Sequence, residues 1–390
     1  MSNNLTIHHA GPEIINDPSR WAPLPEVEPQ AFQTSSQKLV YLGGIYNLMG
    51  LYQGLRIGNT LQEINADHPE NPVDYFSLTL FGQKEIKDFL EEETFVRNTY
   101  NEYGKLRPTS YVNRLIHKVL LPHDLLTQWK ACSNPTPAMF DYFSRINLLG
   151  FSYGHRIIQQ LDVGMQACLE KEHLPVFPLR ALKAVTLAAA TLPVANGQIH
   201  QLLFTRSSDS YVEKPLSQAL FSNGTQKYPA IRDGNSVCIG EKCDDDVIHS
   251  VCVKNVNAER TLPEFFSETQ KDGHTFWLYT NPPVLEKDDK IYVTNSCLGA
   301  LFRTALREML TSPRGSDFRF QNVPVLARLL DPETNKQTAQ SLQKWRWLKL
   351  RHYQTLQDQY KKLWPDTVAQ KENLTRDLAR LTAASSPSFL

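Results

Sequence analysis

The chain has 390 residues, of which 41% are hydrophobic, enough for one large α/β domain with additions or for two domains of ordinary size. Its 41 basic and 41 acidic side chains cancel, which excludes a general electrostatic attraction to nucleic acid or to an acidic membrane surface. The six cysteines show no disulfide framework and fit free thiols in a reducing compartment.

The sequence contains no segment typical of a signal peptide or a membrane span. Residues 1–25 are polar and lack an apolar core. The longest uncharged run, Ala184 to Thr205, is interrupted by Pro193 and several polar residues, which a bilayer-spanning helix of about 20 residues would not tolerate well. We therefore expect a cytoplasmic protein without a transmembrane segment or a nucleic-acid partner. Export by a route without a cleaved signal is an open alternative.

The pattern of apolar runs predicts an alternation of strands and helices. Short apolar runs ended by turn residues predict strands at Lys38–Gly44, Asp74–Phe81, Ser144–Gly150, Ala184–Thr191, Ile199–Phe204 and Val247–Val253. Helical spacing predicts helices at Leu48–Ile64, Tyr111–Ala131 and Tyr153–Cys168, with a charged helix or cap at Lys84–Tyr103. The run Ala184–Thr191 also fits a short buried helix. This succession predicts an α/β fold with a mostly parallel sheet flanked by helices.

Three parts are expected along the chain. Residues 1–34 form an extended N-terminal arm, 35–310 form the α/β domain, and 311–390 form a helical C-terminal extension. Two helices, Asn335–Trp364 and Asp366–Leu381, are predicted in this extension and are separated by Pro365. The first is basic and rich in aromatic residues, which favours a docked or protein-binding helix over a membrane-surface or nucleic-acid role.

The segment Gly150-Phe151-Ser152-Tyr153-Gly154 has the form Gly-x-Ser-x-Gly, with a predicted strand directly before it and a predicted helix directly after it. A sharp strand-to-helix turn exposes the serine hydroxyl, and the glycines allow neighbouring elements to approach closely. The alternative is a glycine-lined turn with an incidental serine. The segment Arg145 to Gly154 resembles the nucleophile elbow of α/β-hydrolase-fold esterases and lipases. His155 departs from the resemblance, because these enzymes commonly have a small residue at this position.

This resemblance implies that an acid and a base follow Ser152 in the chain. Asp209, in a turn after the strand Ile199–Phe204, is the first choice for the acid, ahead of Asp233 and the run Asp244 to Asp246. A turn aspartate that caps its own loop is the structural alternative. His274, in a Gly-His turn, is the first choice for the base, and His249, inside a predicted strand, is the second.

The resemblance also implies an oxyanion hole of two backbone N–H groups. One belongs to Tyr153, directly after the serine. The second belongs to Ile45, in the glycine-containing loop after the first predicted strand. A tight turn without a catalytic role is the alternative for that loop.

Two cysteine patterns suggest other chemistry. The first pattern matches no zinc-site spacing that we can defend, so we expect no metal. It consists of Cys238, Cys243, His249 and Cys252. Cys297, ahead of a helical pattern at Leu298–Leu310, could be a thiol nucleophile, an arrangement similar to permuted papain-like enzymes.

The sequence therefore predicts a serine hydrolase that cleaves an ester, thioester or related acyl bond of a small acyl or lipid-like substrate, without a cofactor. The alternatives are a non-catalytic interaction module on the same scaffold and a Cys297 hydrolase or acyltransferase.

Overall fold

The computed structural model describes most of the first two thirds of the chain and parts of the remainder. The described residues are 5–12, 25–43, 58–78, 91–92, 106–222, 226–242, 249–251, 279, 285–287, 290–293, 298–315 and 317–341. Contacts divide the chain into two compact units. The first comprises Met1–Phe204, Arg232–Cys238 and Ala305–Asn322, and the second comprises Thr205–Ile231, Ile239–Thr304 and Val323–Leu390.

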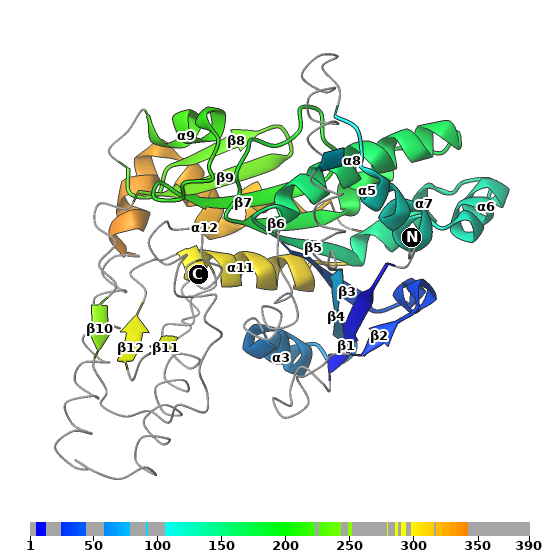
Figure 1. Cartoon of the computed structure of the whole chain (residues 1–390), viewed down its shortest axis with the longest axis horizontal. Helices are drawn as coiled ribbons and strands as arrows, with labels where there is room; N and C mark the ends of the chain where they lie inside the picture. Colours follow the sequence, from blue (N-terminus) through cyan, green and yellow to red (C-terminus); the bar gives the residue numbers. More distant parts are fainter. Residues whose placement is uncertain are drawn as a thin grey trace, which may run out of the picture. The chain divides into compact units, whose positions relative to one another are not determined.

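One sheet of nine strands is the centre of the fold, in the order β2-β1-β4-β3-β5-β6-β7-β9-β8 (Figure 1). Its strands are β1 (Ile7–Ala10), β2 (Glu26–Val27), β3 (Gln37–Leu42), β4 (Val73–Leu78), β5 (Ile146–Phe151), β6 (Lys183–Leu187), β7 (His200–Arg206), β8 (Ala230–Asp233) and β9 (Ser236–Glu241). The five neighbours from β4 to β7 run parallel. β1 pairs antiparallel with β4 and with β2. The prediction of an α/β class with a mostly parallel sheet is confirmed.

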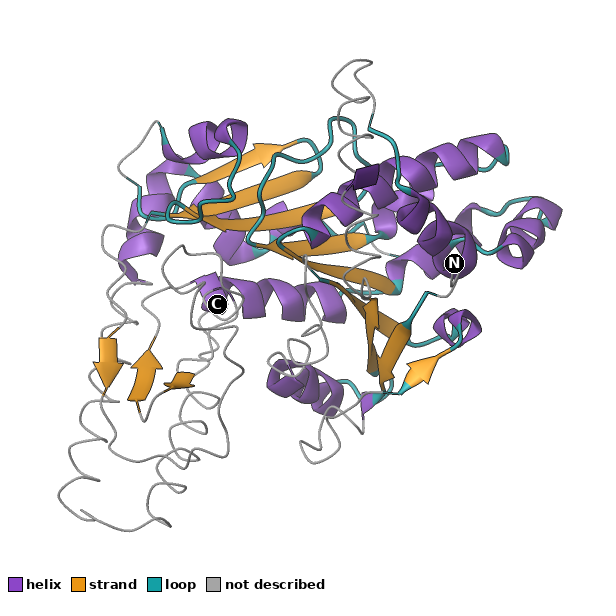
Figure 2. Cartoon of the chain, viewed as in Figure 1, coloured by secondary structure: helices purple, strands orange, loops and turns teal. Residues whose placement is uncertain are grey.

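The central strands are buried on both faces, which explains why the sequence shows them as continuous apolar runs. Every residue of β3, β5, β6 and β7 is buried. Such strands need helices on both faces of the sheet, since neither face can be left in water. Figure 2 shows helices on both sides of the sheet.

The described helical elements include the end of the predicted helix Leu48–Ile64, whereas nearly all of the predicted helix or cap Lys84–Tyr103 lies outside the described residues. The helical elements are η2 (Pro29–Gln33), α3 (Gly58–Asp67), α5 (Ser110–Leu115), η3 (Ile116–Leu120), α6 (His123–Ala131), α7 (Thr136–Ser144), α8 (Gly154–Lys171), η4 (Phe177–Ala181), α9 (Lys214–Phe221), α11 (Leu298–Thr311), η8 (Phe320–Asn322) and α12 (Pro324–Leu330). The predicted helix Tyr111–Ala131 is divided into α5, the π-helical η3 and α6, because Pro122 starts a new helix. Helix α8 matches the predicted helix after the serine motif.

Helices α5 to α8 cover one face of the sheet. The hydrophobic core on this face joins Val40 of β3, Leu148 of β5 and Ala184 of β6 to Leu115 of α5 and Leu161 of α8. Side chains alternate between the faces along a strand, so Lys183 of β6 belongs to the opposite face.

Lys183 is a buried lysine at the start of β6, and its hydrogen bonds explain why it is tolerated there. Its Nζ donates to the Met309 carbonyl at 3.1 Å and to Ser312 Oγ at 2.7 Å, at the C-terminal end of α11. Burial lowers the pKa of Lys183 to about 7. The side chain therefore attaches the end of α11 to the second face of the sheet, where an ammonium group also compensates the helix dipole.

The predicted N-terminal arm contributes strands to the sheet. Ile7 to Ala10 pair with Leu78 to Tyr75, which places β1 beside β4. The nine-stranded sheet thus extends to residues before position 35.

The second unit contains a small antiparallel sheet in the order β10-β12-β11, made of β10 (His249–Val251), β12 (Lys290–Val293) and β11 (Leu285–Lys287). Residues 332–341 are helical. Asn335 donates to the Tyr228 carbonyl at 3.0 Å and to the Leu329 carbonyl at 2.6 Å, and so fixes the start of this helix within the unit. The rest of the two predicted C-terminal helices lies outside the described residues. Within the described part of the chain, no helix has both the length and the hydropathy needed to cross a membrane.

Candidate active site

Ser152 lies in a two-residue turn between a buried strand and a long helix. β5 ends at Phe151 and α8 begins at Gly154. Ser152 has φ +53°, in the left-handed region that non-glycine residues seldom adopt. A residue with a side chain in this conformation is strained by roughly 1–3 kcal/mol, and such strain is concentrated at functional sites.

Close packing requires glycine at position 154 and leaves little space beside Gly150. A Cβ at Gly154 would overlap the Leu42 carbonyl oxygen at the end of β3 and would lie 2.9 Å from the Leu42 carbonyl carbon. A Cβ at Gly150 would lie 2.8 Å from Ile158 Cδ1 and 3.2 Å from Thr186 Oγ1. The glycines therefore allow α8 to start directly against β3 and β5, and this close approach produces the sharp turn at Ser152.

Backbone hydrogen bonds hold the turn in place. The Ser152 N–H donates to the Leu187 carbonyl of β6 at 2.9 Å, and the Ser152 carbonyl accepts the His155 N–H at 3.0 Å. Ala188, directly after Leu187, also has φ +53°. Two strained residues thus lie at the carboxyl edges of the neighbouring strands β5 and β6.

The structure brings one part of the expected oxyanion hole to the turn. Tyr153 has helical backbone angles and directly precedes α8. The end of β3, Leu42, lies against Gly154. The loop expected to supply the second N–H group therefore starts beside the serine motif, although Ile45 itself lies outside the described residues.

His155, the departure noted in the sequence, is fully buried on the first turn of α8. Burial lowers the pKa of His155 to about 3, and the charge of Arg156 contributes to this decrease. The nearby carbonyls of Leu192 and Thr191 raise the pKa, but their effect is smaller. Neither ring nitrogen has a hydrogen-bond partner of good geometry in the described part of the chain. The imidazole is therefore neutral near pH 7 and is a poor general base for Ser152.

Asp209 follows β7 by three residues and is buried, with 5% of its surface exposed. Its Oδ1 accepts the Tyr211 N–H at 3.0 Å, and its Oδ2 accepts the Tyr279 hydroxyl at 3.4 Å. The first contact is the local turn bond expected for an aspartate that caps its own loop. The second is a long-range bond, since Tyr279 is 70 residues away and fully buried.

The structure describes only some of the other candidate acids and bases. Asp233 ends β8, is exposed, and directly precedes the two-residue turn Gly234-Asn235 that leads to β9. His249 begins β10, and the structure describes its backbone only. His274 and the run 244–246 lie outside the described residues.

A buried ion pair near Asp209 was not predicted from the sequence. Arg206 Nε lies 3.1 Å from Glu241 Oε2, with the two side chains 6% and 2% exposed. The carbonyl of Arg206 accepts the Asp209 N–H at 3.2 Å. Removing one partner of such a pair leaves a buried charge uncompensated, so Arg206 and Glu241 fix the backbone from which Asp209 projects. The sequence contains no local signal for this pair, because its members are 35 residues apart.

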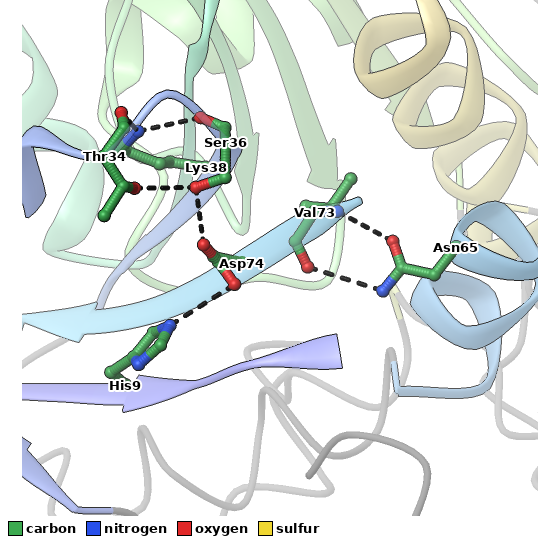
Figure 3. Close-up of polar contacts among 7 residues, drawn as sticks. All are labelled: His9, Thr34, Ser36, Lys38, Asn65, Val73 and Asp74. Atoms are coloured by element: carbon green, nitrogen blue, oxygen red, sulfur yellow. Dashed lines mark hydrogen bonds and ion pairs between the residues drawn. The ribbon is translucent and has the colours of Figure 1, made fainter. Parts of the chain in front are cut away.

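A second group of serine, aspartate and histidine lies at the amino ends of β3 and β4 (Figure 3). Asp74 accepts a hydrogen bond from Ser36 Oγ at 2.5 Å and lies 3.4 Å from His9 Nε2. Burial would raise the pKa of Asp74, but these contacts and the charge of Lys38 outweigh it and lower the pKa. The aspartate lies between the serine and the histidine, so the histidine cannot take the serine proton. Lys38 Nζ donates to the carbonyls of Thr34 and Ser36, which makes the group a structural connection among β1, β3 and β4.

The cysteines support no second site among the described residues. Burial raises the pKa of Cys238 to about 12, so this thiol is protonated and a poor ligand or nucleophile. Cys243, Cys252 and Cys297 lie outside the described residues. No three His, Cys, Asp or Glu residues of the described part are arranged to hold a metal ion.

Comparison with models of known protein families and with curated proteins finds no match for this sequence.

Proposed function

We propose that the protein is a serine hydrolase with an α/β-hydrolase-like fold that cleaves an ester, thioester or related acyl bond through an acyl-enzyme at Ser152. The observation that carries this proposal is the conformation of Ser152. It is a non-glycine residue at φ +53° between a buried strand and a long helix, and the close packing of this helix against β3 requires glycine at position 154. This is the geometry that exposes a nucleophilic hydroxyl at the carboxyl edge of a sheet.

The strand order supports the proposal. The parallel strands follow the order β4-β3-β5-β6-β7, so β5, which precedes Ser152, is central. Parallel strands direct their carboxyl ends to the same edge, where ligands of open α/β sheets bind. Asp209 follows the carboxyl end of β7, two strands from β5. The chain order Ser152, Asp209, His274 is that of an α/β-hydrolase triad.

The proposed mechanism has two steps. In the first, His274 takes the proton of Ser152 Oγ as the oxygen attacks the acyl carbonyl, and the imidazolium then gives this proton to the leaving alcohol or thiol. In the second, His274 takes a proton from water, the hydroxide attacks the acyl-enzyme, and Ser152 recovers its proton as the acid is released. Asp209 orients the imidazole throughout.

Negative charge on the acyl oxygen is stabilised by backbone N–H groups. The proposal assigns this role to the amides of Tyr153 and Ile45, with the N-terminus of the 18-residue helix α8 adding a favourable dipole. His155 has no place in this mechanism, because a pKa of about 3 makes its imidazole too weak a base to take the serine proton.

Histidine variants test the triad. We expect His274→Ala to lower kcat/KM for p-nitrophenyl butyrate by at least about a thousandfold, because the serine loses its base. We expect His249→Ala to stay within about threefold of the wild type. The reverse pattern would assign the base to His249. Full activity in both variants, with folding confirmed by circular dichroism, would rule out both histidines as the base and favour the thiol at Cys297.

The predicted C-terminal helices have no role in the proposed mechanism. Their basic and aromatic composition favours a protein partner, which is a separate proposal from the catalytic one. Pull-down with the full chain and with a variant in which Trp345 and Trp347 are replaced by alanine tests it.

A further inference from the structure

The loop between β6 and β7, Ala188–Ile199, starts beside Ser152. Leu187, the last residue of β6, accepts the Ser152 N–H at 2.9 Å. Two residues later, the Ala189 N–H donates to the Phe204 carbonyl of β7 at 2.9 Å. Ala188 and Ala189 are fully buried, so the loop is fixed in position as it leaves the sheet next to the nucleophile turn.

Helix α8 holds both ends of this loop through buried polar side chains at helical spacing. Gln159 Nε2 donates to Thr191 Oγ1 at 3.1 Å and to the Leu192 carbonyl at 2.6 Å. Three residues further along the same helix, the carboxylate of Asp162 accepts the N–H groups of Gln198 at 3.0 Å and Ile199 at 3.2 Å. Residues at this spacing lie on one face of a helix. The loop therefore has two fixed ends and is not a hinged lid.

The orientation of the Gln159 amide is set by its neighbour. Arg156 Nη1 lies 3.1 Å from Gln159 Oε1. A guanidinium group can only donate hydrogen bonds, so the amide oxygen must face Arg156 and the amide nitrogen must face the loop. This nitrogen has two acceptors there, and Gln159 itself is 3% exposed.

Between the two anchors the loop is uncharged and mostly apolar. Leu192, Pro193 and Val194 are half-buried and follow the anchor at Thr191, and the exposed Ala195 and Asn196 come before the anchor at Gln198. An apolar surface next to an acyl-transfer nucleophile favours apolar acyl chains, since each buried methylene contributes about 0.8 kcal/mol.

We propose that Gln159 is a positioning residue that fixes the β6–β7 loop as an apolar wall beside Ser152, and that this wall selects substrates with extended apolar acyl chains. The inference rests on the proposed function of Ser152. Gln159 itself contacts no reacting atom and acts through the loop.

Two variants of Gln159 and one matched control test the inference. Gln159→Leu removes both hydrogen bonds to the loop. Gln159→Glu keeps the acceptor for Arg156 but cannot donate to Leu192. The control is Gln160→Leu, because Gln160 is equally buried on the same helix and its amide bonds to Thr109 N at 2.9 Å instead of to the loop.

The measurements are steady-state kinetics on p-nitrophenyl acetate and octanoate, and hydrogen exchange of the loop amides. For both Gln159 variants we expect KM for the octanoate to rise about tenfold while kcat and the KM for the acetate change less than about threefold. Exchange of the amides of residues 189–192 and of Val194 should accelerate in the same variants. Gln160→Leu should change neither the exchange of this loop nor the ratio of the two KM values.

The outcomes separate this inference from the proposed function. An unchanged octanoate KM in Gln159→Leu, with the wild type active, overturns the inference and leaves the nucleophile in place. Equal changes in Gln160→Leu also overturn it, because they would indicate general loosening of α8. A wild type that hydrolyses neither ester overturns the proposed function itself.

Discussion

Replacing Ser152 by glycine is expected to abolish hydrolysis and at the same time to stabilise the protein. Loss of the nucleophile should lower kcat by about 10⁵-fold or more, as for other catalytic serines. Glycine adopts φ +53° without steric cost, so the strain of the turn is released. Relative to Ser152→Ala, which keeps a Cβ in the same conformation, we expect the glycine variant to gain about 1 kcal/mol of unfolding free energy. Thermal and urea denaturation measure this difference.

Ala188→Gly is the control for strain without catalysis. Ala188 has the same φ of +53° at the end of the neighbouring strand and carries no reactive group. This variant should gain similar stability and should keep the nucleophile. If Ser152→Gly is no more stable than Ser152→Ala, the turn is not strained. If Ser152→Gly retains hydrolysis, another residue is the nucleophile.

Replacing Gly154 by alanine is expected to be among the most destabilising single changes in the chain. The new Cβ would overlap the Leu42 carbonyl oxygen, which belongs to the backbone of a buried strand and cannot move aside as a side-chain end could. Alanine is intrinsically a better helix former than glycine by about 1 kcal/mol, but the steric overlap is much larger. We expect a loss of about 3 kcal/mol or more of unfolding free energy, which should show as a lowered thermal midpoint and a disturbed serine turn.

Gly11→Ala is the matched control, because its Cβ would have its nearest neighbours, Asp74 Oδ1 and a His9 ring carbon, at 3.9 Å, an ordinary van der Waals distance. This control should remain within about 0.5 kcal/mol of the wild type. A Gly154→Ala protein as stable as the control would contradict the close approach of α8 to β3, and with it the structural origin of the turn.

The serine turn could be predicted from sequence because its determinants are local. An apolar run, two glycines and a helical pattern are contiguous from Arg145 to Cys168, and the structure has a strand, a turn and a helix there. The buried parallel strands were found for the same reason, since each is a short apolar run ended by turn residues. The positive φ of Ser152 and the steric need for Gly154 depend on the approach of β3, about 110 residues earlier, and so are visible only in the structure.

Features that depend on long-range pairing were missed. The strands β1 and β2 are short, with four and two residues, and join the sheet only through β4. The β8–β9 hairpin was also missed, although the turn Gly234-Asn235 has the glycine at its first position that such a hairpin favours, with φ +56°. Gln159 and Asp162 look like ordinary polar residues of a helix in the sequence. Their burial against the β6–β7 loop gives them a role that no local pattern indicates.

The most direct test of the central claim is to treat the purified protein with a fluorophosphonate probe and to locate the adduct by peptide mass spectrometry. We predict a single adduct on Ser152, formed by the wild type and by Ala188→Gly and absent from Ser152→Ala. An adduct on another serine, or no adduct on the folded wild-type protein, would contradict an activated nucleophile at the turn between β5 and α8.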